Sequence, residues 1–164
     1  MITEFIITSA TVLSAFSVAS EGGSSSPYYY NASYEDGQVA TMDVLQPYGQ
    51  YLRNKLKYKF TYDSDGRLVE KRVMTWDDWS NKWHETEILH YDYTADSIIL
   101  TLMRDKEHKG VMTPVEKYLY TMINSKVMAI DIQRWDSRKH DMVSIEKMLW
   151  VGCMGKMIAD VARK

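Results

Sequence analysis

The stretch YKFTYDSDGRLVEKRVMTW, residues 58–76, alternates aromatic or apolar residues with polar ones on both sides of an Asp-Gly pair. Successive side chains of an extended strand point to opposite faces, so this period of two places Tyr58, Phe60 and Tyr62 on one face. The Asp-Gly pair can adopt the backbone geometry that a tight turn requires. The stretch therefore predicts two antiparallel strands joined by a short turn.

The rest of the chain repeats this pattern. Short runs rich in β-branched and aromatic residues alternate with turn residues, among them Asp36-Gly37 and the break QPYGQ at residues 46–50. Strands joined by short loops must be antiparallel, because parallel neighbours need crossovers of about a dozen residues or more. We predict an all-β fold, an antiparallel up-and-down meander of about eight or nine strands that forms a strongly twisted or curved sheet or an open barrel.

An internal repeat supports this prediction. Trp76 and Trp135 each lie ten positions after a turn residue, and an aspartate follows each of them. Three intervals of seven positions, each containing a polar loop, recur along the chain: Trp76 to Trp83, Arg104 to Val111 and Trp135 to Met142. Because loop length fixes the register of a hairpin, equal intervals predict equivalent hairpins.

Three motifs resemble a known family. They are the strand-turn-strand YxFTYDxxGRL, the hairpin TWDDWSNKW, and the run EKYLYT followed by a strand that ends in RW. Together they are similar to a family of small secreted Bacteroidetes proteins, a domain of unknown function, over roughly Tyr28 to Trp150. YDxxGR also occurs in the tyrosine-aspartate (YD) repeats of large β-rich shells, so the resemblance implies a β-rich fold with YD-repeat-like hairpins. It implies no activity and no catalytic residues.

Length and composition define the domain organisation. A chain of 164 residues is about one domain, and its 20 Lys plus Arg nearly balance its 22 Asp plus Glu, which argues against a nucleic-acid partner. We expect an N-terminal apolar segment with a Gly/Ser linker at residues 1–26 and a single β domain at 27–152. Residues 153–164 form a tail, predicted as a short helix or a frayed end.

The first twenty residues are apolar and small, and the tripeptide Ser17-Val18-Ala19 suits signal peptidase. Glu4 and the lack of basic residues depart from the usual signal peptide. We interpret the segment as the remnant of a signal peptide and expect a secreted or periplasmic protein. Thr and Ser interrupt the apolar run, so no stable membrane span is expected. If the segment is retained, we expect it to pack on the body as a helix or a strand.

Common catalytic and metal-binding motifs are absent from the sequence. There is no GxSxG, Walker loop or GxGxxG, and the four histidines lack zinc-ligand spacing. Cys153 is the lone cysteine, and DSDG at residues 63–66 lacks the further oxygen ligands of a calcium loop, so we interpret it as a turn. The acidic pairs Asp77-Asp78 and Glu85/Glu87 are typical of solvated turns and strands. We expect no cofactor, no metal site and no catalytic residue.

The tryptophans are the candidate ligand-binding residues: Trp76, Trp79 and Trp83, with Trp135 and Trp150 as further members. Indole faces can stack on sugar rings. Alternatively, Trp76 and Trp83 flank the loop as a cross-strand pair that stabilises the hairpin. Trp79 lies at the loop apex, where core packing does not explain it.

Three hypotheses follow from these observations. The first is a non-catalytic exported binding or scaffolding domain at the bacterial cell envelope, with a polysaccharide or an envelope protein as its partner. The second is a glycan-binding module that uses the exposed Trp and Tyr residues. The third is a carboxylate-dependent hydrolase, for which a sequence cannot show the required pair of acids across a cleft. We favour the first hypothesis.

Overall fold

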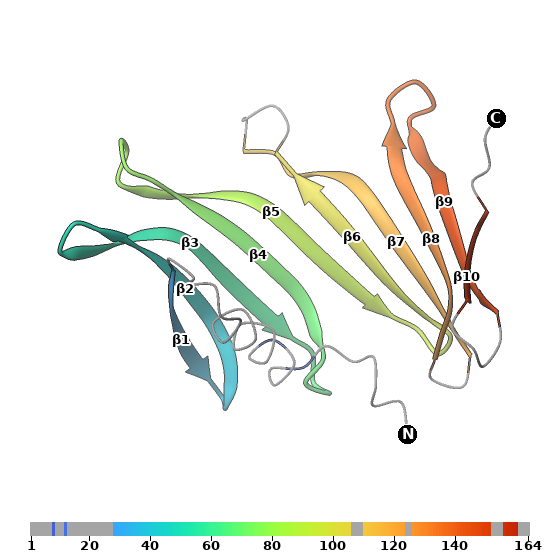
Figure 1. Cartoon of the computed structure of the whole chain (residues 1–164), viewed down its shortest axis with the longest axis horizontal. Coiled ribbons are helices and arrows are strands. Elements are labelled where there is room, and N and C mark those ends of the chain that lie inside the picture. The colour runs from blue at the N-terminus through green and yellow to red at the C-terminus, as the bar shows by residue number, and fades with distance from the viewer. Residues whose placement is uncertain are drawn as a thin grey trace. The chain divides into compact units, whose positions relative to one another are not determined.

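The computed structural model describes residues 8, 12, 28–105, 110–123, 126–151 and 156–160. Its elements are ten β-strands (Figure 1). In chain order they are β1 (Tyr29–Glu35), β2 (Gln38–Tyr48), β3 (Tyr51–Tyr62), β4 (Leu68–Asp77), β5 (Lys82–Tyr93), β6 (Ser97–Arg104), β7 (Thr113–Ile123), β8 (Lys126–Asp136), β9 (Asp141–Val151) and β10 (Lys156–Asp160). Among the residues that the structure describes, no helix is long and apolar enough to cross a membrane.

The order of the strands in the sheet is their order in the chain, from β1 to β10, without a crossover. The strand pairs β1–β2, β2–β3, β3–β4, β6–β7, β7–β8, β8–β9 and β9–β10 are all antiparallel. The prediction of an all-β, antiparallel up-and-down meander is therefore confirmed. The described part of the chain holds ten strands, because the tail, predicted as a short helix or a frayed end, instead contains β10, which pairs with β9.

The chain divides into two compact units, and the division falls within β5. The N-terminal unit is Ile6–Ile88, and the C-terminal unit is Leu89–Lys164 with Met1–Phe5. The sequence pattern did not predict this division, because β5 reads as one uninterrupted strand across it.

The N-terminal unit has a buried apolar face. The buried side chains of its strands come from β2 to β5: Val39, Met42, Val44, Phe60, Leu68 and Ile88. Directly paired residues of neighbouring strands share a face, and Met42 lies opposite Tyr58 whereas Thr41 lies opposite Lys59. The alternation in the sequence therefore separates an apolar face from a charged one, as the period of two predicts.

Two residues of the segment 1–26 are described, and they belong to this unit. Val12 is buried, and its N–H donates a hydrogen bond to the carbonyl oxygen of Thr8 at 3.0 Å, which is the i to i−4 bond of a helical turn. A helical turn at these two positions is one of the two forms, helix or strand, expected for the segment if it is retained. The Gly/Ser linker and the other residues of 1–26 lie outside the described residues.

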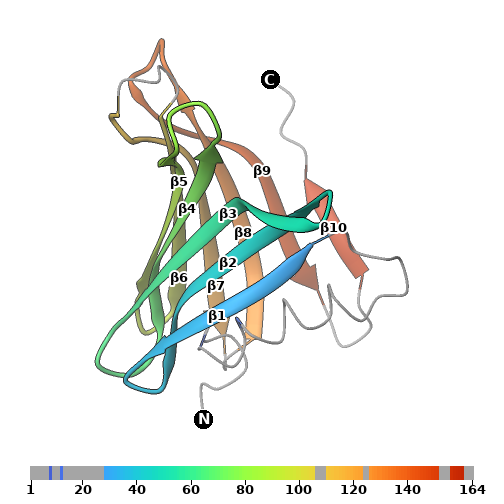
Figure 2. The ribbon, with the colours of Figure 1, turned by 90° about the vertical axis from the view of Figure 1, so that its left-hand side faces the viewer.

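Turns and bulges shape each unit. Asp36 and Gly37 both have positive φ, 49° and 77°, as the predicted β1–β2 turn requires. Register shifts occur within β1–β2, β2–β3 and β3–β4 of the N-terminal unit, and within β6–β7, β7–β8 and β8–β9 of the C-terminal unit. Each bulge bends its strand and increases the local twist, and Figure 2 shows β1, β2 and β3 as adjacent, slanted ribbons.

The C-terminal unit has a thinner core. The strand register places Ile98, Tyr120, Ile130 and Met148 in one row across β6 to β9, yet all four are only half-buried. Among the residues described in this unit, Tyr91 and Val115 are the buried apolar side chains. Burial raises the pKa of the Tyr91 hydroxyl to about 12.

Candidate functional site

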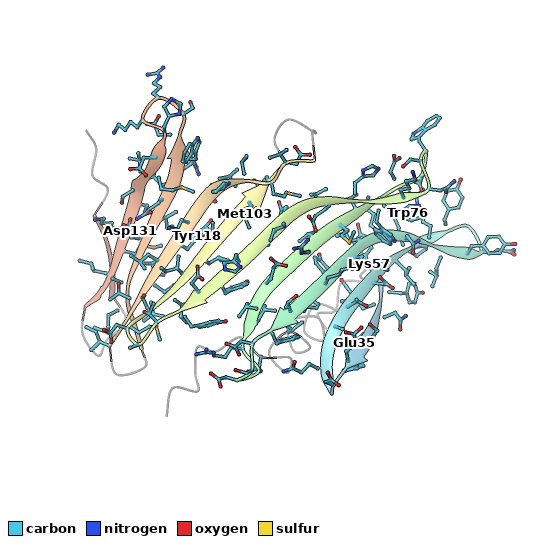
Figure 3. The ribbon with its side chains drawn as sticks, turned by 180° about the vertical axis from the view of Figure 1, so that it is seen from behind. Glu35, Lys57, Trp76, Met103, Tyr118 and Asp131 are labelled. Carbon is cyan, nitrogen blue, oxygen red and sulfur yellow. The ribbon has the colours of Figure 1, made fainter. Side chains whose placement is uncertain are left out.

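Trp76 and Trp83 form a packed pair at the ends of β4 and β5. Their ring centroids lie 5.1 Å apart with the planes at 67°, the edge-to-face arrangement that aromatic pairs favour. The ammonium of Lys57 lies 5.0 Å from the centroid of the Trp83 ring and 3.2 Å from Oδ1 of Asp43 (Figure 3, where Trp76 and Lys57 are labelled). The two rings therefore pack against each other across the hairpin, as the interpretation of them as a cross-strand pair expects.

Trp79 lies apart from this pair, in the turn that joins β4 and β5. Its side chain is 97% exposed. The turn beneath it is well defined, because the Asp77 carboxylate accepts the Trp79 N–H at 2.9 Å and the Ser80 hydroxyl at 2.7 Å. These bonds, led by that of the Ser80 hydroxyl, lower the pKa of the Asp77 carboxyl. Asn81 completes the turn with a φ of 52°.

A second exposed aromatic group lies at the end of the neighbouring hairpin. Tyr48 and Tyr51 are directly paired at the ends of β2 and β3, and they are 64% and 77% exposed. Gly49 between them has a φ of 60°, which a glycine adopts without strain. QPYGQ was predicted only as a break between strands, so Tyr48 and Tyr51 were not among the predicted site residues. The pattern Tyr-Gly-Gln-Tyr, two aromatic residues flanking a two-residue turn, was the available indication.

Arg53 connects the two hairpin ends. Its guanidinium carbon lies 4.9 Å from the centroid of the Tyr48 ring, and its Nη1 lies 3.4 Å from Oδ2 of Asp78, the residue before Trp79. We call Tyr48, Tyr51, Arg53, Asp78 and Trp79 the aromatic tip. The β2–β3 and β4–β5 turns that carry it project from the same end of the N-terminal unit (Figure 1). An exposed ion pair contributes little stability, so its main effect is to orient the two ends.

The acidic pairs Asp77-Asp78 and Glu85/Glu87, the acids considered for the hydrolase hypothesis, all interact with other residues of the chain. Asp77 accepts bonds from its own turn and Asp78 contacts Arg53. Glu85 lies 3.3 Å from Nη1 of Arg72. The charge of Glu87 interacts with the Lys71 ammonium. Burial lowers the pKa of that ammonium, and the negative charge of Glu87 acts in the opposite direction. Their arrangement is that of ion pairs and turn caps.

The DSDG stretch is a turn, as predicted. Oδ1 of Asp63 accepts the N–H groups of Asp65 and Arg67 at 3.0 and 2.9 Å, and Oδ2 accepts Nε of Arg67 at 2.7 Å. Burial acts to raise the pKa of the Asp63 carboxyl, but these hydrogen bonds together lower it. In the ranges that the structure covers, no three His, Cys, Asp or Glu side chains are grouped to hold a metal ion. His108 and Cys153 lie outside those ranges.

The β8–β9 turn repeats the plan of the β4–β5 turn. Oδ1 of Asp136 accepts the Arg138 N–H at 2.8 Å, and His140 has a φ of 51°. Asp136 and His140 thus correspond to Asp77 and Asn81, which supports the predicted equivalence of the hairpins. Trp135 lies opposite Met142 and is 39% exposed. The side chain of Trp150 is outside the described part of the chain.

Comparison with known proteins identifies related sequences and folds. The model of DUF3836, a family of unknown function, matches residues 1–122. The crystal structure of a protein of unknown function from Bacteroides fragilis is similar, with a TM-score of 0.68 and 18% identity, over 75% of this chain and 91% of that chain. A DUF3836 family protein from Bacteroides vulgatus gives a TM-score of 0.52 and 22% identity, over 55% and 92%. These likenesses show the fold. A search of curated proteins found no match.

Proposed function

This chain belongs to the DUF3836 family, and we propose that it is a non-catalytic binding domain, exported to the bacterial cell envelope, that holds its partner through the aromatic tip. The observation that carries the proposal is the position of Trp79, 97% exposed on a turn fixed by Asp77. The free energy falls when a partner covers a large aromatic side chain that is exposed to water. Such residues contribute much of the binding energy at interfaces.

The partners of the carboxylates favour binding over catalysis. A glycosidase needs two acids on opposite sides of a cleft, one of them with a raised pKa. Asp77 instead has a lowered pKa and caps a turn, while Asp78 and Glu85 form ion pairs with arginines. A carboxylate-dependent hydrolase is therefore the less favoured function. Turnover of glycan or peptide libraries by the wild-type chain, lost in Asp78→Asn, would instead establish it.

Binding can be tested by co-sedimentation of the purified full chain with envelope fragments of Bacteroides fragilis. We expect saturable binding that Trp79→Ala weakens about tenfold, because truncation of an aromatic residue central to an interface costs more than about 1 kcal/mol and about 1.4 kcal/mol is a factor of ten. The matched control is Arg138→Ala, at the corresponding exposed position of the β8–β9 turn. Equal binding by both variants, or no saturable binding at all, would contradict the proposal.

Export can be tested separately. The full chain, expressed in a Bacteroides host, should be found outside the cytoplasm, and its N-terminus distinguishes cleavage before Ser20, after the Ser17-Val18-Ala19 tripeptide, from the retained segment in which Val12 is buried. Mass spectrometry of the fractionated protein measures both properties. An intact chain confined to the cytoplasm would count against export, and the sedimentation assay would still report on binding.

A further inference from the structure

We infer that the aromatic tip is a site for a neutral oligosaccharide, an inference that rests on the proposed function and names the chemical class of its partner. Trp79 and Tyr51 are the most exposed large side chains of the tip, at 97% and 77%. Their ring faces can stack on the C–H faces of sugar rings, because an aromatic face carries partial negative charge. Arg53 and Asp78 add a donor and an acceptor beside them for sugar hydroxyls.

The two hairpin ends are preorganised for such a ligand. Tyr48 and Tyr51 close β2 and β3 as a direct pair, and the hydrogen bonds of Asp77 fix the turn that carries Trp79. Aromatic side chains have only two rotatable side-chain bonds, so little conformational entropy is lost when a ligand covers them. Arg53 contacts both ends, through the Tyr48 ring and Asp78, and so orients them relative to each other.

The charges of the tip favour a neutral ligand. The two turns and their flanks, residues 48–53 and 77–82, contain two basic residues, Arg53 and Lys82, and two acidic ones, Asp77 and Asp78. Recognition of anionic lipid surfaces usually involves clusters of about four to eight basic residues, and phosphate backbones likewise attract basic patches. The tip has neither a basic nor an acidic excess, so it offers no charge that would select an ionic polymer.

The size and composition of the tip favour a sugar over a protein. A stable protein interface buries about 800 Å² on each partner around a central apolar core. The tip consists of two hairpin ends, and Leu52, the aliphatic residue next to Tyr51, lies on the opposite face of the hairpin because strand residues alternate. What remains on the tyrosine face is a small surface of flat rings with polar groups beside them. A chain of sugar rings matches that surface.

The test is affinity electrophoresis of the full chain through gels containing dextran, laminarin, xylan or mannan, all neutral polysaccharides. We expect at least one of them to retard the wild-type chain, with affinity lowered at least tenfold in Trp79→Ala and in Tyr51→Ala. Arg138→Ala should be retarded like the wild type. Because Trp79 and Tyr51 are exposed, both variants should keep the wild-type circular dichroism spectrum and Tm.

Two further probes make the outcome decisive: polygalacturonate, an anionic polysaccharide, and vesicles of phosphatidylglycerol and phosphatidylcholine. Retardation by no neutral polysaccharide, equal retardation of all variants, or binding confined to either of these probes would overturn the inference. If neutral glycans fail while sedimentation with envelope fragments still depends on Trp79, the binding function stands and the ligand class is wrong. If both assays fail, the proposed function itself is wrong.

Discussion

The β4–β5 and β8–β9 hairpins close with turns of the same length and the same backbone plan, but they present different side chains. In each, an aspartate accepts the N–H two residues ahead, and a residue with positive φ lies four positions after that aspartate. At the position between them, the first turn carries Trp79 and the second carries Arg138. The shared residues build the turn, whereas the residue at its exposed apex is free to differ. Function is therefore to be sought at the apex.

The strand ends beneath the two turns also differ. Trp76 contacts Trp83 edge to face, and the Lys57 ammonium lies over the Trp83 ring. Trp135 instead lies opposite Met142 and remains 39% exposed. The N-terminal unit thus supports the base of its turn with an aromatic pair, whereas the Trp79 side chain above it is exposed to solvent.

The largest expected effect comes from removing this support. Trp76→Ala should lower the free energy of unfolding by about 2 kcal/mol, less than a fully buried tryptophan would cost because the ring is half-buried. Trp135→Ala, the matched change, should cost about 1 kcal/mol, since it leaves no orphaned aromatic partner. Urea unfolding followed by circular dichroism measures both. Equal losses would show that the edge-to-face pair adds nothing to the first hairpin.

The turn aspartates should have the next largest effect. Asp77→Ala and Asp136→Ala each remove a side-chain acceptor from backbone N–H groups, and each should lower the Tm by about 2–4 °C, as loss of a cap does. Thermal unfolding at pH 7 measures the change. A similar loss at both positions would confirm that the turns are equivalent, and a loss at only one would break the comparison.

The contribution of Asp77 should depend on pH. Its pKa is lowered in the folded chain, led by the bond from the Ser80 hydroxyl, so it binds protons less readily than in the unfolded chain. The stability that it adds is therefore present above its unfolded pKa of about 4 and is lost as the pH falls through its lower folded pKa. The Tm difference between wild type and Asp77→Ala should shrink steadily below about pH 4. A difference that stays constant down to pH 2 would show that the carboxylate charge is not involved.

Much of this fold follows from local sequence. The period of two around Phe60, the Asp-Gly turns and the equal intervals after Trp76 and Trp135 depend only on neighbouring residues, and the structure bears them out. The strand β10 was missed because helix propensity in the tail is overridden by pairing with β9, which is a tertiary effect. The division within β5 was missed because composition does not change there.

The candidate site was only half predictable. Alternation and loop position separate Trp79 from the packed Trp76 and Trp83, so the exposed member could be named from sequence. Its companions could not be, because Arg53 reaches Asp78 across 25 positions, through a contact that exists only when the two hairpins lie side by side. Long-range side-chain contacts of this kind leave no periodic pattern in the sequence.

The smallest expected effect on stability comes from exchanging the apex residues. Trp79→Arg and Arg138→Trp should each change the free energy of unfolding by no more than about 0.5 kcal/mol, because both side chains are exposed and the aspartates accept hydrogen bonds from the backbone N–H groups of these residues, which the exchange keeps. Urea midpoints of the two single variants and of the double exchange measure this.

Binding to envelope fragments should nevertheless be lost in Trp79→Arg and should not return in the double exchange, since Arg138 has no described equivalent of the Tyr48 and Tyr51 pair. Recovery of binding in the double exchange would show that any exposed tryptophan on such a turn is sufficient, and that the β2–β3 hairpin contributes nothing to recognition.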